Sequence, residues 1–158
     1  MPSEAFQDYY PDDFSQCYGC GRLNPAGLQL KTRWEDEAAG VTITRFTPRA
    51  EHTAVPGFVY GGLIASLIDC SGTGSAAGAA YRAAGRRPGE GAPFRFVTGS
   101  LKVSYLKPTP LGPELEIRCK VEEVKGRKIT LSATLSARGE VCATGDVVAL
   151  QIPDDFGT

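Results

Sequence analysis

The sequence predicts a single α+β domain in which one long helix packs against a six-stranded antiparallel sheet. Three observations indicate this fold class. A helical stretch with almost no charge spans residues 61–84, runs of alternating apolar and polar residues lie on both sides of it, and short polar or glycine-containing segments separate those runs. A helix and a sheet of this kind each bury one face against the other. The expected order of elements is ββαββββ.

Two strands are expected before the helix and four after it. The first two enclose the polar turn EDEAA and are predicted to form a hairpin. The last three, joined by the turns KGR and RGE, are predicted to form a meander, and Pro108 and Pro110 end the long run that precedes it. The six predicted strands span residues 28–34, 40–46, 94–108, 114–124, 128–137 and 140–152.

Residues 1–27 are rich in Tyr, Pro, Asp and Gly, and we expect them to form an irregular leader on the domain made by residues 28–158. Because the leader carries acidic residues and has no apolar core, it lacks the features of a secretory signal, and we expect a cytoplasmic location. The aromatic side chains expected to hold it in place are Tyr9, Tyr10, Phe14 and Tyr18.

Charge gives no indication of a polyanionic partner. The chain has 17 basic and 18 acidic residues, a net charge of −1, and the two signs are interspersed. No chain-wide field would attract nucleic acid or an anionic membrane surface. The helical stretch also has too few large apolar side chains for a membrane span. We therefore expect neither nucleic acid nor membrane as a partner.

Five cysteines are scattered along the chain, and we expect them to be reduced. Cys17 and Cys20 form a C-x-x-C pair. Because the chain has a single histidine, His52, it lacks the second ligand pair that a zinc site of this type requires. We therefore expect no metal, and we expect the pair to be buried small residues in a tight turn.

Asp69 is the only charged residue between Gly61 and Tyr81. Helical spacing places it on one stripe with Gly62, Ser66 and Thr73, which we call the polar lane. A face in water would normally carry Lys and Glu, so we expect this helix to be covered nearly all round. The carboxylate is then either a solvated or hydrogen-bonded side chain, or one half of a site.

The second half of such a site would be the glycine pair at the helix start. The N–H groups of Gly61 and Gly62 are unpaired there and can hold a carbonyl oxygen that gains negative charge. Asp69 lies eight residues further on, roughly 12 Å along the helix axis. One chain cannot bring both groups to the same carbonyl. If they cooperate, the carbonyl lies between two subunits.

Two segments, CYGCGRLNPAGLQL and PGFVYGGLIASLIDCSGTGSA, resemble sequence blocks of the hotdog-fold acyl-CoA thioesterases of the phenylacetate-pathway thioesterase-like family. The resemblance implies a hotdog fold, in which a six-stranded sheet wraps one central helix. It also implies hydrolysis of an acyl-CoA thioester by a homodimer or a dimer of dimers, with the site at the dimer interface. Coenzyme A would enter as part of the substrate, and no cofactor is expected.

The resemblance assigns roles by position. Gly61 matches the backbone donor to the thioester carbonyl, with Gly62 beside it, and Asp69 matches the carboxylate that attacks the carbonyl or activates water. Thr98 matches a hydroxyl that positions that water. Further candidates for substrate binding are Ser66 in the polar lane, His52 before the glycines, and Arg82, Arg86 and Arg87 after the helix, whose guanidinium groups could meet the phosphates of coenzyme A.

Two positions depart from the family pattern. Tyr60 stands where many members have His, and Ala54 where several have Asn. The Tyr60 phenol can still donate a hydrogen bond, and we expect Tyr60 to be a further substrate-binding residue. These departures keep a second function open, a non-catalytic acyl-CoA-binding or regulatory hotdog domain. A third, an enoyl-CoA hydratase, would pair an acidic residue with His52. The acyl group, whether aromatic, short or medium-chain, does not follow from the sequence.

Overall fold

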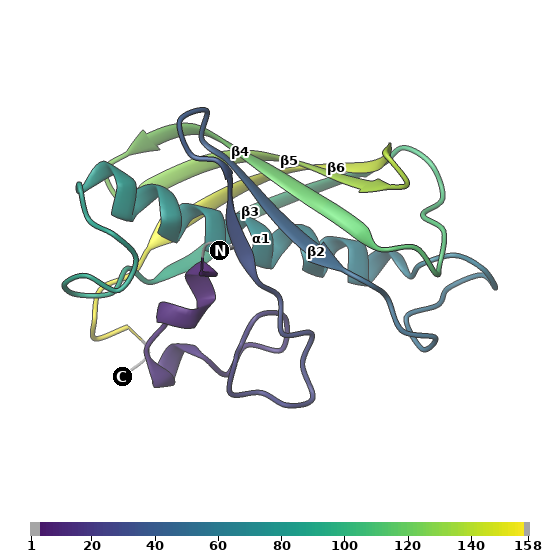
Figure 1. Cartoon of the computed structure of the whole chain (residues 1–158), viewed down its shortest axis with the longest axis horizontal. Helices are drawn as coiled ribbons and strands as arrows, with labels where there is room; N and C mark the ends of the chain where they lie inside the picture. Colours follow the sequence, from purple (N-terminus) through teal and green to yellow (C-terminus); the bar gives the residue numbers. More distant parts are fainter. Residues whose placement is uncertain (1–3, 157–158) are drawn as a thin grey trace.

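The computed structural model describes residues 4–156 and contains the six strands and the long helix in the predicted order. The strands form one antiparallel sheet in the order β1-β2-β4-β5-β6-β3, and helix α1 lies along one face of it (Figure 1). This is the hotdog arrangement. The elements are β1 Thr32–Asp36, β2 Val41–Phe46, α1 Gly61–Ala83, β3 Phe96–Tyr105, β4 Leu115–Lys125, β5 Lys128–Ala137 and β6 Glu140–Gln151.

The predicted start of the first strand is wrong. Strand β1 begins at Thr32, four residues later than expected, because Gln29 has a φ of 57° and leaves the extended conformation. Its side-chain amide donates to the carbonyl oxygens of Gly21 and Asn24, at 3.0 and 2.6 Å. The segment before β1 therefore belongs to the leader's hydrogen-bond network, although Leu28 and Leu30 are buried as a strand would bury them.

Helix α1 is covered on two sides, as its lack of charge predicts. On the sheet side, a Cβ at Gly72 would lie 2.7 Å from Val147 of β6. On the opposite side the leader lies against the helix (Figure 1), and a Cβ at Gly78 would lie 2.5 Å from the ring of Phe6. Small helix residues therefore allow close approach on both sides. The polar lane forms the less buried strip between these contacts, since Ser66, Asp69 and Thr73 are half-buried.

The leader is held mainly by residues that the sequence did not single out. Phe6 and Gln7 are fully buried, and Gln7 exchanges two hydrogen bonds with Thr32 of β1, at 2.8 and 2.9 Å. Burying one Phe side chain stabilises a fold by about 1.5–3 kcal/mol. Of the predicted anchors, Tyr10 is buried, Phe14 packs against the core and Tyr9 is half-buried. Tyr18 is 60% exposed, so its predicted role as an anchor is wrong.

The leader also contains two short 3-10 helices, Phe6–Tyr9 and Asp12–Phe14, where an irregular chain was expected. Among the described residues, α1 is the only long helix, and its composition is not apolar enough to cross a membrane.

Candidate active site

Asp69 lies in the middle of α1, and Thr98 on β3 faces it. The Thr98 hydroxyl donates a hydrogen bond to Asp69 Oδ1. The pairing of β3 with β6 shifts register between Thr98 and Ser100, which marks a bulge at Gly99. Thr98 lies two residues after the buried Phe96 and on the same face of the strand, so its side chain points toward the helix. The contact leaves the second carboxylate oxygen of Asp69 available for a further partner.

A cavity of about 310 Å³ opens beside this pair, and we call it the acid hollow. It is bounded by helix α1, the start of β3 and the leader. Asp69 and Thr98 are both half-buried, so the carboxylate is accessible to a small molecule without being fully solvated. The lining combines apolar and aromatic side chains with Asp69 and Thr73 of the polar lane, a group of thiols, and the polar residues Asp13, Gln16 and Thr98. The lining residues are Tyr10, Asp13, Phe14, Gln16, Cys17, Cys20, Asp69, Cys70, Thr73, Phe96, Val97 and Thr98.

The start of α1 has free backbone donors. Tyr60 precedes the helix with φ −63° and ψ 130°, and its side chain makes no capping hydrogen bond. Its carbonyl oxygen accepts from the N–H groups of Leu63 and Ile64, at 3.1 and 3.3 Å. Within residues 4–156, neither the Gly61 N–H nor the Gly62 N–H has an acceptor. These two groups can therefore bind an oxygen from outside the subunit.

A second cavity, of about 630 Å³, lies beside these donors, and we call it the helix-start hollow. Tyr105 of β3 donates to the Gly61 carbonyl oxygen at 2.7 Å and fixes this end of the helix against the sheet. The rest of the lining is mostly apolar. The lining residues are Ala54, Val55, Phe58, Val59, Gly61, Ile64, Tyr105, Leu106, Lys107, Pro108 and Thr109.

Tyr60 and Ala54, the two departures from the family pattern, both lie at this end of the molecule. The Tyr60 ring lies over Gly62, so a Cβ there would come within 2.2 Å of the phenol oxygen. The Tyr60 side chain is nevertheless 55% exposed. Ala54 lines the helix-start hollow itself. A small residue and an exposed phenol therefore take the places of the family's Asn and His.

One subunit holds the two halves of the predicted site in different cavities. Asp69 and Thr98 line the acid hollow, and Gly61 lines the helix-start hollow, with eight residues of helix and roughly 12 Å between Gly61 and Asp69. The residues of β3 between Thr98 and Tyr105 connect the two hollows along the sheet. Within the part of the chain that the structure describes, β3 is the last strand of the sheet and pairs only with β6, so this edge has an unpaired side.

His52 lies outside both hollows. Its side chain is buried, its ring packs against Phe46 at 5.7 Å between centroids, and its Nδ1 accepts from the Arg49 backbone N–H at 2.9 Å. Burial lowers the pKa of His52, and the charge of Arg49 acts in the same direction. Within one subunit, its side chain closes its own loop and does not reach Asp69.

The arginines after the helix also lie away from Asp69. Asp69 to Ala83 spans roughly 21 Å of helix axis. The Arg86 guanidinium stacks on Phe94, 4.5 Å from its ring centroid, and donates to two backbone carbonyls of its own loop. Arg87 is exposed and lines a separate cavity together with Arg82.

The Ser66 hydroxyl donates back to the Gly62 carbonyl oxygen at 2.9 Å.

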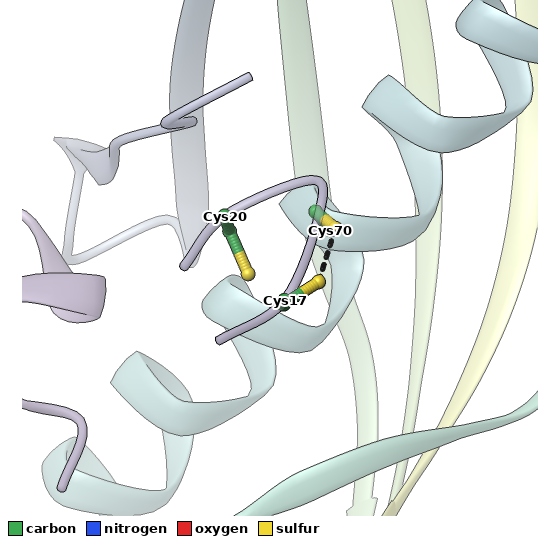
Figure 2. A group of neighbouring side chains, drawn as sticks. All are labelled: Cys17, Cys20 and Cys70. Atoms are coloured by element: carbon green, nitrogen blue, oxygen red, sulfur yellow. Dashed lines mark hydrogen bonds between the residues drawn. The ribbon is translucent and has the colours of Figure 1, made fainter. Parts of the chain in front are cut away.

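Sequence reasoning missed a group of three cysteines in the acid hollow. Figure 2 shows Cys17 and Cys20 on the leader facing Cys70 on α1, and the sulfur atoms lie within 4.8 Å of one another. Cys17 and Cys70 are 53 positions apart in the chain, so no local spacing indicates their contact. Cys17 is also exposed, whereas a buried residue was expected.

A family model described as the thioesterase superfamily matches residues 56–144, more than half of the chain. The chain belongs to this superfamily. Acyl-coenzyme A thioesterase THEM4 of Xenopus laevis is 36% identical over 107 residues, which are 68% of this chain and 42% of that protein. The corresponding protein of Mus musculus is 31% identical over 72% of this chain and 44% of its own length. The chain thus spans less than half the length of these two curated relatives.

Solved structures agree with this assignment. A thioesterase superfamily protein from Shewanella loihica PV-4 is 45% identical, with a TM-score of 0.66, and the match covers 91% of this chain and all of that one. The PaaI protein of the Escherichia coli phenylacetic acid degradation operon shares the fold at 15% identity and a TM-score of 0.63, over 80% of this chain and 81% of its own. The predicted hotdog thioesterase resemblance is confirmed.

Proposed function

We propose that this protein hydrolyses an acyl-CoA thioester at a site built from two chains of a homodimer. The observation that carries the proposal is the position of Asp69, a half-buried carboxylate held by Thr98 at the edge of a cavity. The free N–H groups at the start of α1 of the partner chain would supply the complementary feature, a place for an oxyanion. The relatives named as acyl-coenzyme A thioesterases support this class of reaction.

In the proposed reaction, the thioester carbonyl oxygen accepts a hydrogen bond from the Gly61 N–H of one chain. In a first route, Asp69 of the other chain takes a proton from a water molecule, and that water adds to the carbonyl carbon. In a second route, the Asp69 carboxylate itself adds to the carbonyl carbon. The C–S bond breaks, and the coenzyme A thiolate leaves and takes up a proton. In the second route, water then hydrolyses the acyl-carboxylate intermediate. Thr98 holds Asp69 in position in both routes.

The edge strand β3 is the surface through which we propose that two chains meet. It is ten residues long and most of its residues are exposed. A long edge strand with a free side is a template for pairing with a second chain. Antiparallel pairing across a two-fold axis would set the Thr98 end of one β3 beside the Tyr105 end of the other. That arrangement brings the acid hollow of each chain toward the helix-start hollow of its partner.

The acyl group would occupy the apolar part of the joined hollows, and this location is compatible with aromatic or aliphatic acyl groups. Arg86 and Arg87 remain candidates for the coenzyme A phosphates only if the nucleotide extends to the far end of α1. Five free cysteines favour a reducing compartment, and we propose the cytoplasm.

The test is the loss of thioester absorbance from a panel of aryl- and aliphatic-acyl-CoAs, measured with the native protein and Asp69→Asn. Absorbance is preferable to a thiol reagent, which would also modify Cys17. We expect turnover that the variant lowers by roughly 10²- to 10⁴-fold, the usual contribution of a general base. Saturable acyl-CoA binding without turnover would instead identify a non-catalytic binding domain. Native turnover by the Asn variant would refute the role of Asp69.

A further inference from the structure

The three cysteines of the acid hollow come from two separate parts of the fold. Cys17 and Cys20 lie on the leader, and Cys70 lies on α1 directly after Asp69. Cys17 Sγ and Cys70 Sγ are 3.8 Å apart, and no pair of the three sulfurs is more than 4.8 Å apart. All three are free thiols. Among the described residues, Cys119 and Cys142 are also free thiols, but they belong to strands β4 and β6 and not to this group.

The spacing of the sulfurs fits a tetrahedral metal. Zinc–sulfur bonds are about 2.3 Å long, so two thiolates on a tetrahedral zinc lie about 3.8 Å apart. The Cys17–Cys70 distance already has this value. The wider pairs would need to close by no more than about 1 Å, which a rotation of a cysteine side chain can supply. Three cysteines also match the soft ligand set that zinc and other thiophilic ions prefer.

The backbone is shaped to bring these thiols together. A Cβ at Gly19 would lie 2.3 Å from Cys70 Sγ, and one at Gly21 would lie 2.5 Å from the backbone nitrogen of Cys17. Glycine at both positions therefore lets the leader close a tight turn and press it onto α1. The Gly21 N–H closes that turn on the Cys17 carbonyl oxygen at 2.8 Å. A turn that only filled space would not require such close approach to a sulfur.

Hydrogen bonds within the group act on the pKa of each thiol. The thiols of Cys20 and Cys70 hold the pKa of Cys17 well below its ordinary value, and the backbone N–H of Gly19 also donates to Cys17 Sγ, at 3.3 Å. The same sharing of one negative charge raises the pKa of Cys20 to about 12 and raises that of Cys70.

We propose that Cys17, Cys20 and Cys70 bind one thiophilic divalent cation, with Zn²⁺ as the physiological ion. Binding forms three metal–sulfur bonds, and each thiol that is protonated beforehand releases its proton to solvent. Three protein ligands leave the fourth position of a tetrahedral ion open. Because all three cysteines line the acid hollow, that position is available to water or a small ligand there.

The bound ion would fasten the leader to α1 one residue from Asp69. The sequence argument against a metal site was the missing second ligand pair, and a third thiol from the helix weakens that argument. The inference does not depend on thioester hydrolysis, because Asp69 is not a ligand in it. Metal binding should therefore persist in Asp69→Asn.

The test is titration of the reduced, chelator-treated full chain with Co²⁺ under anaerobic conditions. We expect saturation at one Co²⁺ per chain, with a sulfur-to-cobalt charge-transfer band and the visible bands of a tetrahedral ion, all abolished by added Zn²⁺. Cys17→Ser should weaken binding by more than about 100-fold, beyond the range of a change outside the ligand shell. Cys142→Ser is the matched control and should leave binding unchanged.

Cys17→Ser is the main variant because Cys17 is exposed and its replacement is the least disruptive. Cys70→Ser and Cys70→Ala follow, each checked for native circular dichroism. Absence of a charge-transfer band in the native chain would overturn the proposal, as would a band that folded Cys17→Ser retains.

Discussion

Replacing Thr98 by Val tests the contact on which the geometry of Asp69 depends. Val has nearly the shape of Thr but cannot donate, so the change removes the hydrogen bond to Asp69 Oδ1 and little else. A hydrogen bond to a charged group contributes about 1.5–3 kcal/mol. At about 1.36 kcal/mol per tenfold change in rate, its loss corresponds to roughly 10- to 150-fold in turnover.

The lower end of that range is the expected result, because both residues are half-buried and water can replace part of the lost bond. We therefore expect Thr98→Val to reduce kcat about tenfold, while Thr98→Ser, which keeps the hydroxyl, stays close to the native rate. The assay is the loss of thioester absorbance at saturating acyl-CoA, with thermal denaturation as a check on folding. Equal loss in the Ser and Val variants, or native turnover by folded Thr98→Val, would refute the reasoning.

Two further predictions concern stability. Gly78→Ala should lower the free energy of unfolding by about 1–3 kcal/mol, because the new methyl group overpacks the buried Phe6 ring. Phe6→Leu in the same chain should recover part of this loss, as measured by thermal denaturation. If the losses of the two single variants simply add in the double variant, the contact between Gly78 and Phe6 is contradicted. Burial lowers the pKa of His52, so as the pH falls the unfolded chain binds a proton at this residue before the folded chain does. The contribution of His52 to the free energy of unfolding should therefore be fully present above about pH 6.5, the ordinary pKa of histidine, and should fall as the pH drops toward about 5. Urea unfolding should show a shallower fall for His52→Asn, and an unchanged slope would mean that another group is responsible.

The elements of the fold could be predicted where local chemistry determines them. Strand β5 has the predicted bounds because turns with Gly126 and Gly139, at φ 61° and 79°, enclose it. The start of β1 could not be predicted, because the left-handed Gln29 is stabilised by side-chain hydrogen bonds to the carbonyl groups of Gly21 and Asn24, which no alternation of apolar and polar residues indicates. Asp69 stood out as the single charge between Gly61 and Tyr81. Its partner Thr98 came from the family resemblance, since the two residues are 29 positions apart and meet only when β3 packs beside α1.

The cysteine group shows the same limit more clearly. The pair Cys17 and Cys20 is visible in the sequence, but its third member lies on the central helix and becomes a neighbour only when the leader packs there. The two departures from the family pattern, Tyr60 and Ala54, could be identified by position. Their effect could not, because it depends on how an exposed ring and a small side chain shape a cavity that is open to a second chain.

The central claim, a site shared between two chains, is tested most directly by mixing two inactive variants. Asp69→Asn removes the carboxylate. Gly61→Pro removes only the backbone donor, because proline suits the first position of a helix and Tyr60 already has the extended conformation that a residue before proline adopts. Gly61→Ala is the control, because it keeps the N–H group and should stay active. Gly61→Pro should lower kcat by roughly 10²- to 10³-fold, the usual effect of losing one oxyanion donor.

The two variant chains, each with a different affinity tag, would be co-expressed in equal amounts and assayed for thioester hydrolysis after the tags confirm that mixed dimers form. A shared site predicts that the mixture recovers about one quarter of native activity, because half of the dimers are mixed and each mixed dimer has one intact site of two. Mixed dimers as inactive as either variant alone would contradict the account.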